Sequence, residues 1–201
     1  MPVSDSGGDK GALPPSSPAT SGDRPMLDND ELLTALHAYW NRQRRGRAMP
    51  DRRDIDPVDI GPAVLPNVAL LDVVDGGARF RYRLAGTAIV DHWGVEVTGK
   101  FLDETMRQGG YRDFVHGLFR DACRHRAPIY SSSLFRWNVD THRMTRRLHL
   151  PLTHGGNDTA IILVGQTFFG AGSEPIPAYR HVFDEGVIEQ QRREILPIAD
   201  S

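Results

Sequence analysis

The sequence predicts an α+β fold, a five-stranded antiparallel sheet with helices covering one face, preceded by an N-terminal amphipathic helix. Two observations predict it. Apolar residues recur at helical spacing in two long segments, residues 32–43 and 111–126. Five other segments are rich in β-branched and aromatic residues and are separated by short turns. The order of elements is therefore a helix, two strands, short helices, a long helix and three strands.

The first helix is expected to begin near Asp28, whose side chain can cap the free backbone N–H groups of the first turn. Arginines crowd its last turn, where positive charge offsets the helix dipole, and Gly46 is a typical stop. Its apolar face is predicted to form a dimer or partner contact, made by Leu32, Leu36, Tyr39 and Trp40. A capped turn with proline at its first position follows at 56–60.

The first two strands are predicted to form a hairpin. Residues 68–74 form the first strand, and the pair Gly76 and Gly77 is a hairpin signal before the second strand starts at Arg79. In that second strand arginine alternates with Phe80, Tyr82 and Leu84, so one face is apolar and the other is cationic. Gly86 and Thr87 break the strand.

The remaining elements are a short helix at 88–93, a long helix at 111–126, and three strands at 129–137, 143–152 and 159–169. Residues 1–25 are dominated by Gly, Ser, Pro, Asp and Thr, a composition that predicts a disordered tail. The expected organisation is this tail, a flanking helix at 26–46, the main domain at 47–170, and a C-terminal extension at 171–201 that could contain a short helix near 184–196.

Composition and charge restrict the class of partner. The net charge of -2 gives no overall basic field, so nucleic acid is not expected as a partner. The single cysteine, Cys123, rules out an intrachain disulfide framework, and the N-terminus lacks the pattern of a secretory signal. No apolar run approaches the length of a membrane span, so no membrane partner is expected and a cytoplasmic location is predicted.

Three stretches, residues 40–57, 80–87 and 98–100, together resemble a family of short bacterial single-domain PAS proteins, over residues 32–169. The resemblance implies sensing or signalling without naming a ligand. It also implies that a helix preceding the PAS core often serves as a dimer contact. The pattern of elements alone leaves other α+β folds open, including cone-shaped and hot-dog folds.

A PAS pocket lies between the inner sheet face and the covering helices, and plain core packing is the alternative role for the same side chains. The predicted ligand-binding residues are Phe80, Tyr82, Trp93, Tyr111, Phe114, Ser133, Phe135, Arg146 and Leu148. Arg146 shares strand parity with Leu148, so it is predicted to reach inward and bind an acidic ligand; an orientation toward solvent is the alternative.

No cofactor or metal is assigned. Haem would need a histidine on the long helix, but helical geometry directs His116 toward water and His125 lies at the helix end. The cysteine motif of flavin-binding photosensory PAS domains is absent around Cys123. Arg124 and Arg126 could lower the pKa of that thiol, although a semi-buried small hydrophobe is the default interpretation.

A zinc site built from His142, His149 and His154 lacks a complete tetrahedral set of ligands. The sequence thus predicts a non-catalytic sensory or regulatory module that binds a small ligand or a partner protein and signals through altered protein contacts. A homodimer and a separate signalling protein are expected as partners. Two alternatives stay open: a small α+β enzyme that uses His149 and an aspartate as an acid-base pair, and a structural interaction domain with a filled core.

Overall fold

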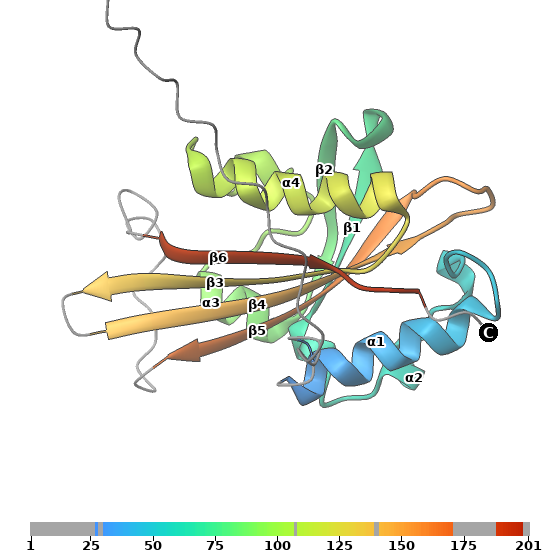
Figure 1. The fold of residues 1–201 in the computed structure, drawn as a ribbon, viewed down its shortest axis with the longest axis horizontal. Helices are drawn as coiled ribbons and strands as arrows, with labels where there is room; N and C mark the ends of the chain where they lie inside the picture. The colour runs from blue at the N-terminus through green and yellow to red at the C-terminus, as the bar shows by residue number, and fades with distance from the viewer. Residues whose placement is uncertain (1–26, 28–29, 107, 139–140, 171–187, 199–201) are drawn as a thin grey trace, which may run out of the picture.

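The computed structural model describes residues 27, 30–106, 108–138, 141–170 and 188–198. A six-stranded sheet with strand order β2-β1-β5-β4-β3-β6 forms its centre, and every neighbouring pair of strands is antiparallel (Figure 1). The α+β fold predicted from the sequence is confirmed. Its strands are β1 (Val68–Val74), β2 (Arg79–Ala85), β3 (Ile129–Asn138), β4 (Thr141–Leu152), β5 (Ile161–Gly170) and β6 (Ile188–Ile195).

Helices lie on both faces of the sheet. The helices are α1 (Glu31–Arg44), α2 (Pro57–Ile60), α3 (Thr87–Trp93) and α4 (Gly110–His125). In Figure 1, α4 lies above the central strands and α1 lies below them. Each face has its own apolar cluster, because β-strand side chains alternate between the two faces. The sheet is therefore buried on both sides, whereas the sequence predicted helices over one face only.

Helix α1 is anchored to the sheet at both ends. At its start, Oγ1 of Thr167 on β5 donates to Oδ2 of Asp30 at 2.5 Å. Its N-cap is Asp30, whose Oδ1 accepts from the backbone N–H of Leu33 at 3.1 Å, so the cap falls two residues after the predicted position. Near the other end, Trp40 Nε1 donates to the carbonyl of Pro151 at 3.0 Å. Between them α1 lies so close to β5 that a Cβ on Gly165 would come within 2.7 Å of two leucine side chains of the helix.

This packing bears directly on the predicted dimer contact. Leu36, Tyr39 and Trp40 are each 3% exposed or less and pack in the cluster between α1 and the sheet, and Leu32 is partly buried against it. The apolar face of α1 is thus covered within the chain itself. A partner contact through these residues would require the helix to leave the sheet, and the structure gives that contact no support.

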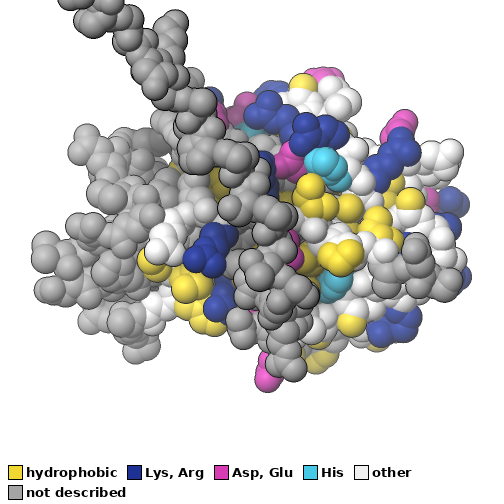
Figure 2. All heavy atoms as spheres, in the orientation of Figure 1, with side chains coloured by type: hydrophobic (Ala, Val, Ile, Leu, Met, Phe, Trp, Pro, Cys, Tyr) yellow, Lys and Arg dark blue, Asp and Glu magenta, His cyan; other side chains and the backbone are white. Residues whose placement is uncertain are grey.

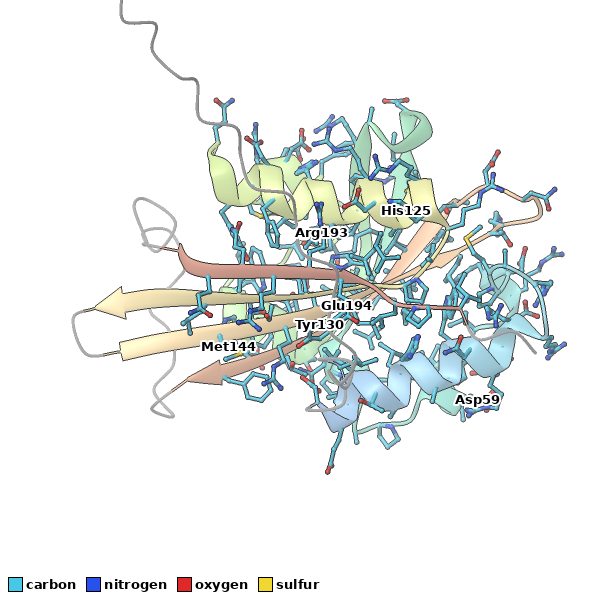
Figure 3. The ribbon with its side chains drawn as sticks, in the orientation of Figure 1. Asp59, His125, Tyr130, Met144, Arg193 and Glu194 are labelled. Carbon is cyan, nitrogen blue, oxygen red and sulfur yellow. The ribbon has the colours of Figure 1, made fainter. Side chains whose placement is uncertain are left out.

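Helix α4 covers the opposite face. Val115, Leu118, Phe119 and Ala122 are buried along one side of the helix, as the helical spacing predicted. Arg193 of the edge strand β6 lies beneath α4, as Figure 3 shows. The Nη1 atom of Arg193 lies 2.5 Å from Oδ2 of Asp121 on α4. This ion pair ties the last strand to the helix.

The C-terminal extension differs from its prediction. Residues that were expected to form a short helix instead form β6, which pairs along β3 from Ile129 with Ile195 to Phe135 with Ile188. The free edge of β3 offers unpaired backbone groups, and a chain that returns to this edge satisfies them in a way no local helix would. The predicted tail at 1–25 lies outside the described residues.

Candidate functional site

A small cavity of about 20 Å³ lies between the sheet and the cover formed by α3, α4 and residues 102–106. It is lined by Ala69, Leu71, Tyr82, Ile89, Trp93, Leu102, Met106, Val115, Phe119, Arg147, Val164 and Gln166. A volume of this size admits about one water molecule. The lining is apolar except for the polar tips of Tyr82 and Trp93, Gln166 and the guanidinium of Arg147.

The polar part of this face comes from three neighbouring strands. On β4 the side chains of Thr145, Arg147 and His149 share one parity and face the α4 side. The sheet register sets Ser131 of β3 directly opposite Arg147, and Gln166 of β5 opposite Arg147 on the other side. Because directly paired residues point to the same face, these side chains form one polar strip across the middle of the sheet.

Arg147 is buried, with 4% of its surface exposed, and its partners are neutral. Its Nη2 donates to the hydroxyl of Tyr111 at 2.5 Å, and the guanidinium lies 5.7 Å from the centre of the Tyr111 ring. With the amide of Gln166 turned so that its oxygen faces donors, Oε1 accepts from Nη2 and Nε of Arg147 at 3.2 and 3.3 Å. The same oxygen accepts from Thr145 Oγ1 at 3.0 Å.

Several buried polar atoms of this strip have no hydrogen-bond partner. They are Arg147 Nη1, Ser131 Oγ, Ser133 Oγ and His149 Nε2. Both serines and the histidine have no measurable exposure to solvent. Native proteins leave few buried polar groups unsatisfied, and each instance calls for an explanation such as an unseen water, ion or ligand.

His149 is held in the neutral form. Its Nδ1 lies 3.3 Å from the carbonyl of Ile129, so Nδ1 carries the proton and Nε2 is a bare acceptor. Burial, and then the charge of Arg147, lowers the pKa of His149 to about 3. Burial likewise raises the pKa of Tyr82 to about 12, so the phenol beside the cavity stays protonated. Neither group balances the charge of Arg147.

A comparison of the sequence with models of protein families identifies the family of this chain. The sequence matches a family model described as a PAS domain over residues 29–166. The chain belongs to the PAS-domain family. A search of curated proteins and a search of solved structures each find no match to the chain. PAS domains are in general sensory or regulatory modules and not catalysts, which agrees with the function class predicted from the sequence.

Most of the predicted aromatic residues lie on the cavity side of this PAS domain. Phe80, Tyr82, Trp93 and Tyr111 are buried in the cluster beneath α3 and α4, and Phe114 is partly buried against it. Of these, Tyr82 and Trp93 line the cavity. Ser133 is buried on the same face. The side chain of Phe135 lies outside what the structure describes.

Two predicted ligand-binding residues lie on the opposite face of the sheet from this cavity. Leu148 packs in the cluster under α1, as does its parity partner Leu150. Arg146 also faces α1, where its Nη1 lies 3.8 Å from Asp30 Oδ2 and its guanidinium lies 4.5 Å from the ring centre of Phe169. The prediction assumed that the apolar set of β4 faces the pocket. In a sheet with two cores, that set faces the other core.

Arg147 and Gln166 are the cavity residues that the sequence analysis did not identify. Two consecutive arginines in a strand must project to opposite faces, so one of the pair had to face the α4 side. That alternation was the available signal. The side chain that it selects, Arg147, sits with Gln166 in the cavity wall.

The histidines that were considered for a cofactor can be placed in the same way. His116 does not point to water as expected; it is half-buried, its ring centre lies 6.1 Å from that of Phe80, and burial lowers its pKa. His125 is exposed at the end of α4, as Figure 3 shows. Neither histidine lines the cavity. Among the described residues, no group of three or more His, Cys, Asp or Glu side chains is arranged to hold a metal ion.

The enzyme alternative relied on His149 as a base with a neighbouring aspartate. The structure places Phe119, Ile129 and Arg147 around His149, and none of the described aspartates forms a hydrogen bond with it. A buried imidazole with so low a pKa is a weak base.

Within the described ranges, no helix is both long and apolar enough to cross a membrane. On the face drawn in Figure 2, basic and acidic side chains are interspersed.

Proposed function

We propose that this PAS domain is a non-catalytic sensory or regulatory module that binds a small molecule in the cavity beneath α3 and α4. The observation that carries the proposal is a cavity whose wall includes Arg147, a buried arginine whose Nη1 has no hydrogen-bond partner. Polar groups buried without partners are costly, so a bound molecule that supplies partners gains free energy from them.

The size of the cavity suggests how binding becomes a signal. As it stands the cavity holds about one water, so a larger ligand must move its cover outward. The cover includes α3, a seven-residue helix that carries Ile89 and Trp93 into the cavity wall. A ligand that binds the open form more tightly shifts the population toward it. The moved outer surface of α3 then changes the contacts available to a separate signalling protein.

The test uses the full chain purified without denaturant. Native mass spectrometry is expected to find a retained small molecule, or a thermal-shift screen of small metabolites is expected to find at least one stabilising compound. The variant Ala69→Val adds two methyl groups to the cavity wall and is expected to weaken that binding.

Leu70→Ile is the matched control, because Leu70 is the next residue of β1 and packs on the α1 side of the sheet. It is expected to leave binding unchanged. A chain that retains nothing, and that no compound stabilises, would contradict the proposal and favour the interaction domain with a filled core.

The homodimer, the cytoplasmic location and the bacterial, single-domain character are proposals. A homodimer is expected from the family resemblance, and sedimentation of the full chain should give the mass of two copies; the mass of one copy would remove the homodimer. Deleting α1 is not a clean test of dimerisation, because it would uncover the apolar sheet residues that α1 covers, such as Leu148, Leu150 and Leu163.

A further inference from the structure

The buried guanidinium of Arg147 is a positive charge without a counter-ion among the described residues. None of their carboxylates lies within 4.0 Å of it, and its hydrogen-bond partners are the phenol of Tyr111 and the amide of Gln166. Arginine does not lose its proton in proteins, so burial cannot neutralise it. An unpaired buried charge is strongly unfavourable, and such charges are normally paired.

The residue that carries the unpartnered atom also lines the cavity. Nη1 is buried and makes no hydrogen bond, while the side chain of Arg147 forms part of the cavity wall. A planar guanidinium binds a carboxylate through two parallel N–H donors, a geometry that a point charge does not provide. Nη1 has no acceptor, and a carboxylate on the edge formed by Nη1 and Nη2 would replace the Tyr111 hydroxyl as acceptor from Nη2.

We propose that the ligand of this PAS domain is a small organic acid, whose single carboxylate binds Arg147 and whose apolar body lies against Ile89, Trp93 and Val115. This inference rests on the proposed function, since it assigns the chemical class of the molecule in the same cavity. One cation in the described wall matches one negative charge on the ligand. A phosphate dianion would need a second cation, and a neutral polar ligand would leave the charge of Arg147 unbalanced.

The rest of the wall agrees with an acid that has an apolar body. Apart from Arg147, Gln166 and the polar tips of Tyr82 and Trp93, the lining is hydrocarbon or thioether. Such a surface gains free energy by covering apolar area and offers little to a second polar group on the ligand. The small volume favours acids of few carbon atoms over long-chain ones.

The probes are butanoate, hexanoate and benzoate, each compared with its primary amide, which keeps the shape and removes the charge. Calorimetric titration and thermal shift of the full chain are expected to show at least one acid binding about tenfold or more tightly than its amide. Arg147→Met keeps the length of the side chain and removes the charge, and is expected to abolish the preference for the acid. Arg146→Met is the matched control, one residue away on the other face, and should keep the preference.

The outcomes distinguish a failure of the organic-acid assignment from a failure of the proposed ligand-binding function. Equal binding of acid and amide by the unmodified chain, or unchanged acid affinity in Arg147→Met, overturns the assignment of an acid while leaving a ligand-binding module in place. The acid and amide comparison uses the unmodified chain, so it stands even where a variant does not fold. Failure of every probe to bind overturns the assignment of an acid, and a chain that also retains no molecule in native mass spectrometry removes the proposed function with it.

Discussion

Arg146 and Arg147 are neighbours on β4 whose guanidinium groups meet opposite electrostatic environments. Nη1 of Arg146 lies 3.8 Å from the carboxylate of Asp30, the N-cap of α1. Nη2 of Arg147 donates to the neutral phenol of Tyr111 on α4. The sheet thus separates an arginine that has a counter-ion from one that, among the described residues, has none. That difference predicts opposite responses to the same substitution.

Replacing each arginine by methionine in the ligand-free protein should change stability in opposite directions. Arg146→Met leaves the buried Asp30 without its cation and is expected to cost about 1–2 kcal/mol of unfolding free energy. Arg147→Met removes an uncompensated buried charge and is expected to be neutral or stabilising. Urea denaturation of the two variants measures both values. A loss of several kcal/mol in Arg147→Met would show that its charge is balanced in the folded protein.

The buried His149 predicts how stability depends on pH. Its folded pKa of about 3 lies below the ordinary 6.5 of histidine, so between these values the unfolded chain binds a proton that the native protein does not. Stability therefore falls as the pH decreases through this window, by at most about 1.4 kcal/mol per pH unit from this group. His149→Gln should give a flatter profile in urea denaturation at about pH 7, 6 and 5. Profiles of equal slope would contradict the buried neutral histidine.

Gly86 follows the last residue of β2, at a position where no side chain fits. A Cβ there would lie 2.3 Å from the carbonyl oxygen of Pro66 and 2.6 Å from that of Leu65, both of them backbone atoms. Gly86→Ala must displace this backbone and is expected to destabilise the fold by about 1–3 kcal/mol or more. Gly156→Ala is the control, since a Cβ there meets no atom within 4 Å. Equal unfolding midpoints for the two variants would count against the tight strand exit.

The thiol of Cys123 is expected to be slow to react. Burial raises its pKa to about 11, in contrast to the lowered pKa that Arg124 and Arg126 could have caused. Those arginines pair instead with Asp121 and Asp158. Two pKa units above the ordinary value correspond to about 100-fold less thiolate at neutral pH. Iodoacetamide should label the native protein far more slowly than the urea-unfolded chain, and comparable rates would contradict the buried thiol.

Local patterns predicted the elements well because each has a local physical cause. The pair Gly76 and Gly77 places the turn of the first hairpin, and the predicted strand at 68–74 coincides with β1. Asp56 caps α2 with Pro57 at its first position, as expected. The sequence of β6 has no such local signal. Its strand form depends on the edge of β3, more than fifty residues earlier in the chain.

The candidate site was only partly predictable, because it depends on which face of each strand meets which helix. Tyr82 and Trp93, which were predicted from their apolar surroundings, line the cavity. The alternation of side chains along β4 was also predicted from the sequence. Its leucines, however, pack in the core under α1 and do not line the cavity. Only the position of α1 on the far face reveals that Arg147, and not Arg146, reaches the cavity.

The binding of an organic acid by Arg147 is tested most directly on the arginine side chains themselves. The Nε–H signals of Arg146 and Arg147, assigned with the two methionine variants, are recorded by NMR while hexanoate is added to the full chain. A saturable shift of the Arg147 signal is expected at the concentration that raises the melting temperature, with the Arg146 signal unchanged. Stabilisation by hexanoate without a shift of Arg147 would contradict it.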